Sequence, residues 1–184
     1  MEVIRDTLDF QIERPTAVCI GKFDGVHMGH RKLIERVVAC KTMGLTPTVF
    51  TFDKAPEELF TGVHNNELCT RLQKQEYLEE LGVEIIIEYP LTKESAAIDP
   101  LDFIEEILVG RLHMRHIVAG PDISFGKGGL GDRELIEVMG ERFGYTTEII
   151  EKVQLDGEDI SSSRIKAAKA SGDEAKARRM LGRL

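Results

Sequence analysis

The sequence lacks a long apolar run, and this absence is the first limit on what the protein can be. Its N-terminus, MEVIRDTLDF, interrupts the apolar residues with charges every few positions. No stretch approaches the roughly 18 consecutive apolar residues that a membrane-spanning helix requires. We therefore expect a soluble, cytoplasmic protein with no membrane partner.

An excess of basic residues is also missing. The chain contains 24 Lys and Arg against 32 Asp and Glu, which gives a net charge of −8. A general nucleic-acid binder carries a basic patch or stripe, so we expect no nucleic-acid partner. A small anionic ligand can still bind at a local site.

Cysteine is scarce, and its spacing argues against a disulfide framework and a zinc site. The three residues Cys19, Cys40 and Cys69 are an odd number, contain no CxxC pair and form no Cys/His cluster at zinc spacing. Such spacing fits neither of these sites. We expect buried free thiols in a reducing compartment, and we assign no protein residue as a metal ligand.

Internal repeats, low-complexity tracts and Pro- or Ser-rich linkers are absent as well. A chain of 184 residues with 42% apolar content can bury its own core. We therefore expect a single domain over residues 1–184. Short apolar runs predict strands at residues 16–21, 46–52, 83–89, 116–120 and 146–155, the last being the longest. Helical periods predict helices at residues 30–44, 67–82, 99–108, 133–144, 161–172 and 173–184.

This alternation predicts an α/β fold, a Rossmann-like doubly wound parallel sheet of about five strands with helices on both faces and short C-terminal helices. With the common strand order 3-2-1-4-5, the first and fourth strands are neighbours where the order reverses. Ligands of such sheets bind beyond the carboxyl ends of the strands at this switch point. The two richest irregular segments, GKFDGVHMGH and GPDISFGKGGLGD, follow these two strands.

The segment after the first strand combines glycines with two histidines. Gly21 and Gly25 permit tight turns and a close approach of the backbone. A helix follows, and its N-terminus attracts phosphate through free N–H groups and the helix dipole. His27 and His30 are three residues apart and share one helix face, and Gly29 leaves room beside them. Two such histidines alone are more often surface or capping residues, but the whole combination favours an anion site.

Two further segments have an ordinary structural interpretation beside a functional one. The loop at residues 120–132 holds five glycines beside Asp122, Phe125 and Lys127. By composition alone it is as readily a surface loop as a ligand loop, but its position at the switch point favours a ligand loop. Hydroxyls and cations gather at residues 161–166, where they form either a simple helix cap or a phosphate clamp.

These motifs resemble those of a known family. GKFDGVHMGH looks like the GxFDGxHxGH signature of the HxGH nucleotidylyltransferase superfamily, and in particular of the bacterial FMN adenylyltransferases, also called FAD synthetases. The similarity covers nearly the whole chain, including TFDKAPEELF, LQKQEYLEELGVE, DPLDFIEEIL, VAGPDISFGKGGLGD and ISSSRIK. Several ordered motifs with matching spacing are far more specific than HxGH alone.

The resemblance implies roles for individual residues. His27 and His30 are the expected catalytic residues, in contact with ATP phosphates. The expected ATP-binding residues are Gly21, Phe23, Asp24, Gly25, Gly29, Ser162, Ser163 and Arg164. The expected flavin-binding residues are Asp122, Phe125 and Lys127. The chain departs from the family pattern at Ile123, where an aromatic residue is usual, at Lys166, where arginine is usual, and at residues 53–56, where DKAP replaces DPHP.

The resemblance also implies a reaction, the transfer of AMP from ATP to FMN to give FAD and pyrophosphate. Mg²⁺ would bridge the phosphates, held mostly by substrate oxygens and water. The family commonly carries a riboflavin kinase domain, which we do not expect within residues 1–184. The chain is then either a stand-alone enzyme or a shortened one, and a kinase domain or a separate riboflavin kinase would supply FMN.

Two alternatives to this reaction remain open. One is another HxGH nucleotidylyltransferase, of the pantetheine-phosphate, nicotinamide-mononucleotide or glycerol-phosphate type. The other is a nucleotide-binding module without turnover.

Overall fold

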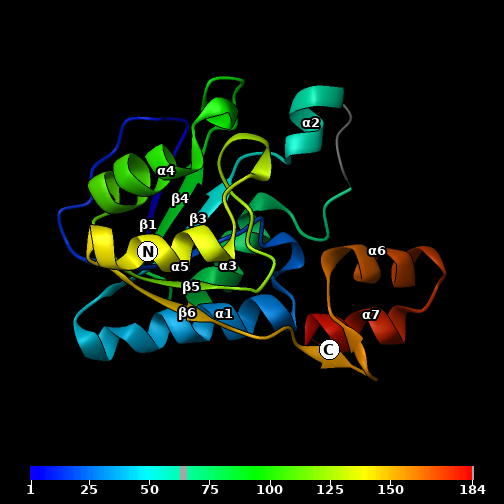
Figure 1. Cartoon of the computed structure of the whole chain (residues 1–184). Coiled ribbons are helices and arrows are strands. Elements are labelled where there is room, and N and C mark those ends of the chain that lie inside the picture. Colours follow the sequence, from blue (N-terminus) through cyan, green and yellow to red (C-terminus); the bar gives the residue numbers. More distant parts are fainter. Residues whose placement is uncertain (63–65, 184) are drawn as a thin grey trace.

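The computed structural model describes residues 1–62 and 66–183, in which helices cover both faces of a parallel sheet (Figure 1). Within these residues the main sheet has six strands in the order β1-β4-β3-β2-β5-β6. Their bounds are Glu2–Arg5 (β1), Thr16–Ile20 (β2), Thr46–Phe52 (β3), Ile85–Tyr89 (β4), Met114–Ala119 (β5) and Thr146–Ile149 (β6). Every pairing between neighbours is parallel.

The predicted α/β class is confirmed, and the order 3-2-1-4-5 holds for the five predicted strands, which are β4-β3-β2-β5-β6 in the structure. The additional strand β1 was not predicted. It lies at the sheet edge and pairs with β4 from Glu2 opposite Ile85 to Arg5 opposite Glu88. Only two apolar residues stand between Glu2 and Arg5, and such short, charged strands are typical of sheet edges.

The predicted strand at residues 146–155 is wrong in its second half. β6 ends at Ile149, and Gln154–Leu155 (β7) instead pairs antiparallel with Glu158–Asp159 (β8). Asp156 and Gly157 connect them with φ values of 54° and 78°. A two-residue turn with positive φ at both positions is the preferred hairpin connection, and Asp-Gly is one of its favoured sequences. The chain therefore reverses direction at this point.

The helices form one layer on each face of the sheet. Helices α1 (Met28–Ala39) and α3 (Arg71–Glu80) cover one face. The other face is covered by α4 (Pro100–Asp102), its continuation as the π-helix η4 (Phe103–Arg111), and α5 (Arg133–Phe143). No helix in the described part of the chain is long and apolar enough to cross a membrane.

The remaining helices are short. They are α2 (Pro56–Thr61), α6 (Ser162–Ala170) and α7 (Glu174–Leu181), with the 3-10 turns η1 (Asp24–Val26), η2 (Cys40–Met43), η3 (Ser95–Ala97) and η5 (Lys127–Gly129). Helix α2 lies outside the helical ranges given above.

The core has two halves, one on each face of the sheet, because successive side chains of a strand point to opposite faces. Val18 and Ile117 pack beneath η4 and α5, whereas Cys19 and Val118 pack beneath α1 and α3. All three cysteines are buried and free, as expected.

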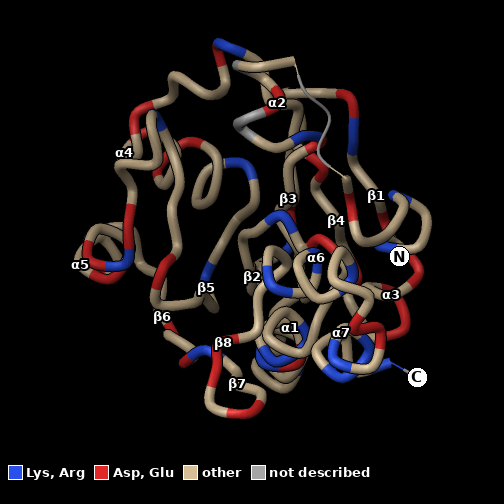
Figure 2. Tube along the Cα trace, turned by 90° about the vertical axis from the view of Figure 1, so that its right-hand side faces the viewer, with Lys and Arg blue, Asp and Glu red and all other residues tan. Residues whose placement is uncertain are grey.

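Helices α6 and α7 form a third, smaller apolar cluster, built around Ile165 and Met180. The two helices lie beside the N-terminal end of α1, as both views of the molecule show (Figures 1 and 2). The guanidinium of Arg31 donates a hydrogen bond of 3.3 Å to the carbonyl oxygen of Gly182, which ties α1 to the end of α7. The C-terminal helices are thereby placed next to the carboxyl end of β2.

Candidate active site

The segment that joins β2 to α1, residues 21–30, is called the HxGH turn below. His27 is the N-cap of α1, and its Nδ1 accepts a hydrogen bond of 3.4 Å from the backbone N–H of His30. The two imidazole rings stack, with 3.6 Å between their centroids and 18° between their planes. The predicted pairing of the histidines at a helix start is therefore what the structure shows.

Burial keeps both imidazoles neutral near pH 7. It lowers the pKa of His27 to about 4, although the nearby charge of Asp24 opposes this shift. The pKa of His30 is held well below its usual value, first by burial and then by the charges of His27 and Lys74. Because Nδ1 of His27 is an acceptor, its proton is assigned to Nε2, where it remains available as a donor.

Phe23 and the glycines shape the HxGH turn around these rings. Phe23 has a φ of 52° and is fully buried, and its ring lies edge-on to His30 at 5.1 Å. It therefore supports His30 and does not present its ring to a ligand. A Cβ on Gly29 would lie 3.3 Å from the His27 ring, and one on Gly21 would lie 3.3 Å from the Phe23 ring. The absence of side chains at these positions leaves space for both rings.

Asp24 fastens the HxGH turn to two other parts of the fold. Its side chain is 3% exposed, and Oδ1 accepts a hydrogen bond of 2.7 Å from the backbone N–H of Leu68. Oδ2 lies 2.8 Å from Nζ of Lys166 on α6. Lys166, one of the departures from the family pattern, thus provides the cation that balances a buried carboxylate. With Oδ1 hydrogen-bonded and Oδ2 ion-paired, Asp24 acts here by holding the turn.

The start of α6 meets the HxGH turn from the other side. Ser161 caps α6 by accepting a hydrogen bond from the N–H of Arg164. The hydroxyl of Ser162 donates a hydrogen bond of 3.1 Å to the carbonyl oxygen of Asp24. Ser163 is exposed in the first turn. The Arg164 guanidinium donates a hydrogen bond of 3.0 Å to the carbonyl oxygen of Asp159 and forms an ion pair with Glu158. The structure thus brings Ser162 to the turn and directs the Arg164 side chain toward the β7–β8 hairpin.

The loop that follows β5 places its three predicted flavin residues in different surroundings. Phe125 is 3% exposed and packs against Phe103 in the core, with 5.7 Å between ring centroids. Asp122 is exposed, and its carboxylate lies 3.0 Å from the ammonium of Lys152. Lys127 is exposed in η5, where its backbone N–H donates a hydrogen bond of 2.7 Å to the carbonyl oxygen of Ile98. Phe125 therefore anchors the loop, and Asp122 and Lys127 present side chains to solvent.

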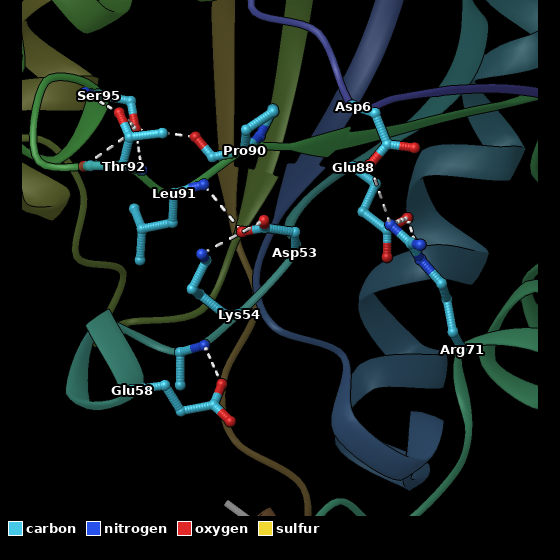
Figure 3. Close-up of polar contacts among 11 residues, drawn as sticks. Asp6, Asp53, Lys54, Glu58, Arg71, Glu88, Pro90, Leu91, Thr92 and Ser95 are labelled. Atoms are coloured by element: carbon cyan, nitrogen blue, oxygen red, sulfur yellow. Dashed lines mark hydrogen bonds and ion pairs between the residues drawn. The ribbon is translucent and has the colours of Figure 1, made fainter. Parts of the chain in front are cut away.

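Sequence reasoning missed two buried polar groups near the carboxyl ends of β3 and β4. Glu88 is 5% exposed and forms an ion pair of 2.5 Å with Arg71, at the start of α3 (Figure 3). Lys74, on α3, is 8% exposed, and its ammonium group donates a hydrogen bond of 3.4 Å to the carbonyl oxygen of Lys22. A signal existed for both residues. Glu88 interrupts the apolar run of its strand, and Lys74 stands four residues before the buried Leu78, on the same helix face.

No group of three or more His, Cys, Asp or Glu side chains suited to a metal ion occurs among residues 1–62 and 66–183. The groups around the HxGH turn are mainly N–H and O–H donors and lysine ammonium groups. This chemistry suits phosphate oxygens.

Comparison with protein families matches residues 9–164 to the FAD synthetase family. The chain is 29% identical over 185 residues to a bifunctional riboflavin kinase/FMN adenylyltransferase of Pseudomonas fluorescens, covering 100% of this chain and 60% of that protein. It is 33% identical over 165 residues to the protein of the same description from Escherichia coli K12, and the match covers 89% of this chain and 53% of that protein. The chain thus spans a little over half the length of these curated relatives.

Solved structures agree on the fold. A structure described as a macrolide-efflux protein from Streptococcus pneumoniae superposes with a TM-score of 0.86 at 24% identity, covering 98% of this chain and 59% of that one. A pantoate-beta-alanine ligase from Francisella tularensis superposes with a TM-score of 0.57 at 15% identity, and the match covers 91% of this chain and 71% of that one. At these identities the likeness concerns the fold alone. The family match, which extends over most of the residues, shows that the chain belongs to the FAD synthetase family.

Proposed function

We propose that this protein transfers AMP from ATP to FMN and releases FAD and pyrophosphate. The observation that carries the proposal is the stacked pair of His27 and His30 at the start of α1, at the carboxyl end of β2. In this sheet β2 lies between β3 and β5, at the point where strand order reverses, which is the usual ligand site of such folds. Membership of the FAD synthetase family supplies the substrates.

The chemistry needs little from the protein except positioning and neutralisation of charge. An oxygen of the FMN phosphate attacks the α-phosphorus of ATP, a P–O bond forms, and the bond between the α-phosphorus and the bridging oxygen breaks as pyrophosphate leaves. No base is required, because the second ionisation of a phosphomonoester has a pKa of about 6. Negative charge grows on the equatorial and leaving oxygens, where fixed donors stabilise it most.

The histidines serve as donors in this scheme. The Nε2–H of neutral His27 and a ring N–H of His30 would contact phosphate oxygens, assisted by the N-terminus of α1. Nδ1 of His30 is buried with no hydrogen-bond partner in the described part of the chain, which supports a donor role for this ring once a phosphate is bound.

Further contacts follow from the elements around the histidines. ATP would lie along the HxGH turn and the start of α6, beside Gly21, Phe23, Asp24, Gly25, Gly29, Ser162, Ser163 and Arg164. Phe23 would contribute its backbone, because its ring is buried against His30. The loop after β5 would face the flavin, through Asp122, Phe125 and Lys127. We propose that Asp24 and Phe125 act through the backbone that they fix, because both side chains are buried and engaged.

Mg²⁺ would enter with ATP. The donors around the HxGH turn suit phosphate oxygens and not a cation, so we propose that substrate oxygens and water hold the ion and we assign it no protein ligand. Bound in this way, Mg²⁺ neutralises part of the triphosphate charge.

We also propose that residues 1–184 form one nucleotidylyltransferase domain. Its FMN would come from a riboflavin kinase, which the names of the longer relatives associate with this activity. Three buried free thiols support a reducing, cytoplasmic location.

The test is to incubate the protein with ATP, Mg²⁺ and either FMN or riboflavin, and to separate the flavins by chromatography while pyrophosphate release is followed. We expect FAD and pyrophosphate in equal amounts from FMN, and neither from riboflavin. Parallel reactions with phosphopantetheine, nicotinamide mononucleotide and glycerol phosphate test the related transferases. Pyrophosphate release with one of these and not with FMN would refute the flavin assignment, and ATP binding without turnover on any acceptor would indicate a non-catalytic module.

A further inference from the structure

Lys74 is a buried cation that the fold itself hardly satisfies. Its side chain is 8% exposed, and in the described part of the chain Nζ makes a single hydrogen bond, of 3.4 Å, to the carbonyl oxygen of Lys22. An ammonium group has three N–H donors. A charge removed from water without an ion pair or full hydrogen bonding costs stability. The structure therefore holds Lys74 at a cost that its own contacts do not offset.

The surroundings of Lys74 carry an excess of positive charge. It shares a small cavity with Thr51, Arg71 and Glu88, where the strands β3 and β4 end. Glu88 is the buried carboxylate of this group, and it is already paired with Arg71 at 2.5 Å (Figure 3). Arg5 lies 3.8 Å from the same carboxylate. Arg5, Arg71 and Lys74 thus line a cavity with one carboxylate, Glu88. The exposed Asp6 lies 3.9 Å from Arg71, so Lys74 is the cation of this group with no ion pair in the described part of the chain. A further anion would complete the balance.

Lys74 is also connected to the HxGH turn. Its hydrogen-bond acceptor belongs to Lys22, which lies between Gly21 and Phe23 in that turn. Its charge is also one of the causes of the lowered pKa of His30. The bond to Lys22 is long, and the four methylene groups of a lysine let Nζ shift toward a nearby acceptor.

We propose that the ammonium of Lys74 binds a phosphate oxygen of the substrates at the HxGH turn, beside His30. This inference rests on the proposed adenylyl transfer, in which both ATP and FMN bring phosphate groups to the turn. A phosphate supplies the acceptors and the negative charge that Lys74 lacks, and charge-assisted hydrogen bonds are the strongest that the site can offer. Lys74 then stabilises charge in the reaction directly, from α3.

Stability separates this role from a structural one. An apolar side chain of similar length removes a poorly satisfied buried charge, so Lys74→Met should leave the melting temperature unchanged or raise it. A lysine that holds the fold together would show the reverse. Lys74→Arg keeps the charge, and Lys32→Met is the matched control, because Lys32 is exposed on α1 two residues beyond His30.

The experiment measures three properties of the four proteins: melting temperature, affinity for MgATP and for FMN separately by titration calorimetry, and steady-state FAD formation. With Lys74→Met we expect a loss of about 10-fold in affinity for at least one phosphate ligand. We expect kcat/KM for FAD formation to fall by about 10²-fold. Lys74→Arg should recover most of both losses, and Lys32→Met should match the wild type.

The ligand that loses affinity identifies the phosphate, that of ATP or that of FMN. Unchanged affinities and turnover in Lys74→Met would overturn the proposal while leaving adenylyl transfer intact. A lowered melting temperature with unchanged affinities would overturn it too. If Lys74→Met does not fold, Lys74→Gln replaces it, and failure of both variants to fold would also overturn the proposal. If the wild type makes no FAD but binds a phosphate ligand in a Lys74-dependent way, the proposed function fails and the role of Lys74 stands. Wild-type protein that binds neither ligand refutes both.

Discussion

The fold should lose stability as the pH falls below about 6.5, because His27 takes up a proton in the unfolded chain before it does so in the folded chain. His27 is 5% exposed, and burial lowers its pKa from 6.5 to about 4. Between these two values the unfolded chain binds a proton that the folded chain does not, so the free energy of unfolding decreases as the pH decreases. Above pH 6.5 both states are neutral, and below pH 4 both are protonated, so the change is confined to this interval.

The size of the effect follows from the two pKa values. One pKa unit corresponds to about 1.4 kcal/mol, so His27 alone should remove about 3 kcal/mol between pH 7 and pH 4. His30 acts in the same direction, because its pKa is lowered as well. The main cause is burial of the His27 ring. In addition, Nδ1 of His27 accepts the N–H of His30 at the cap of α1, and a protonated Nδ1 cannot accept.

The assay is urea unfolding of the wild type and of His27→Gln at a series of pH values from 7.5 to 4.5. Carboxylates also titrate in this range, but their contributions are nearly the same in both proteins and cancel in the difference. The difference in unfolding free energy should shrink by about 2 to 3 kcal/mol from pH 7.5 to pH 4.5. Parallel stability curves would refute the reasoning, since they would mean that the imidazole titrates alike in the folded and unfolded chain.

Three other expectations concern turnover, flavin binding and the shape of the turn. His30→Ala should lower kcat by about 10²-fold in steady-state assays, the usual loss for one fixed donor, and an unchanged kcat would contradict its role. Asp122→Ala should raise KM for FMN more than for ATP, whereas an equal effect of Lys152→Ala would assign the change to their ion pair. Gly25→Ala should cost about 2 to 4 kcal/mol in urea unfolding, from its φ of +75° and a Cβ 2.9 Å from Leu68. Gly172→Ala, with φ +79° and open space around it, should cost only about 1 to 2 kcal/mol.

The sheet was predictable because its central strands are apolar and each is followed by a helical period. Strands at residues 46–52 and 83–89, for example, coincide closely with β3 and β4. The ends of the sheet were not predictable by the same rule. Edge strands bury less apolar surface, so β1 has no apolar run to mark it. Beyond β6 the apolar pattern continues to Leu155, although pairing with β5 ends at Ile149, and the chain then reverses at Asp156–Gly157. The Asp-Gly pair was the available signal for the β7–β8 hairpin.

The histidine pair was predictable because it is local. Residues three apart at a helix start must lie on one face, and the switch-point rule places that face at the ligand site. Long-range partners were not predictable. The sequence gives no indication that Arg164 turns toward Glu158, that Phe125 packs on Phe103, or that Lys166 pairs with Asp24. Each of these contacts depends on how separate elements pack, which periodicity does not report.

An acidic protein that binds two phosphorylated substrates must attract them locally. At physiological ionic strength, charges more than about 8 Å apart are largely screened, so most of the surface acids have little influence on the HxGH turn. The positive groups close to the turn include the N-termini of α1 and α6 and the ammonium groups of Lys74 and Lys166. Lys22, in the turn itself, lies 3.8 Å from Glu67, and the Arg183 guanidinium donates to the Gly25 carbonyl oxygen. Lys166 is neutralised by Asp24 at 2.8 Å, whereas Lys74 faces a carbonyl oxygen. Since both histidines are neutral near pH 7, the attraction comes from the helix termini and from cations such as Lys74 and Arg183, and the imidazoles are left to act as directional N–H donors.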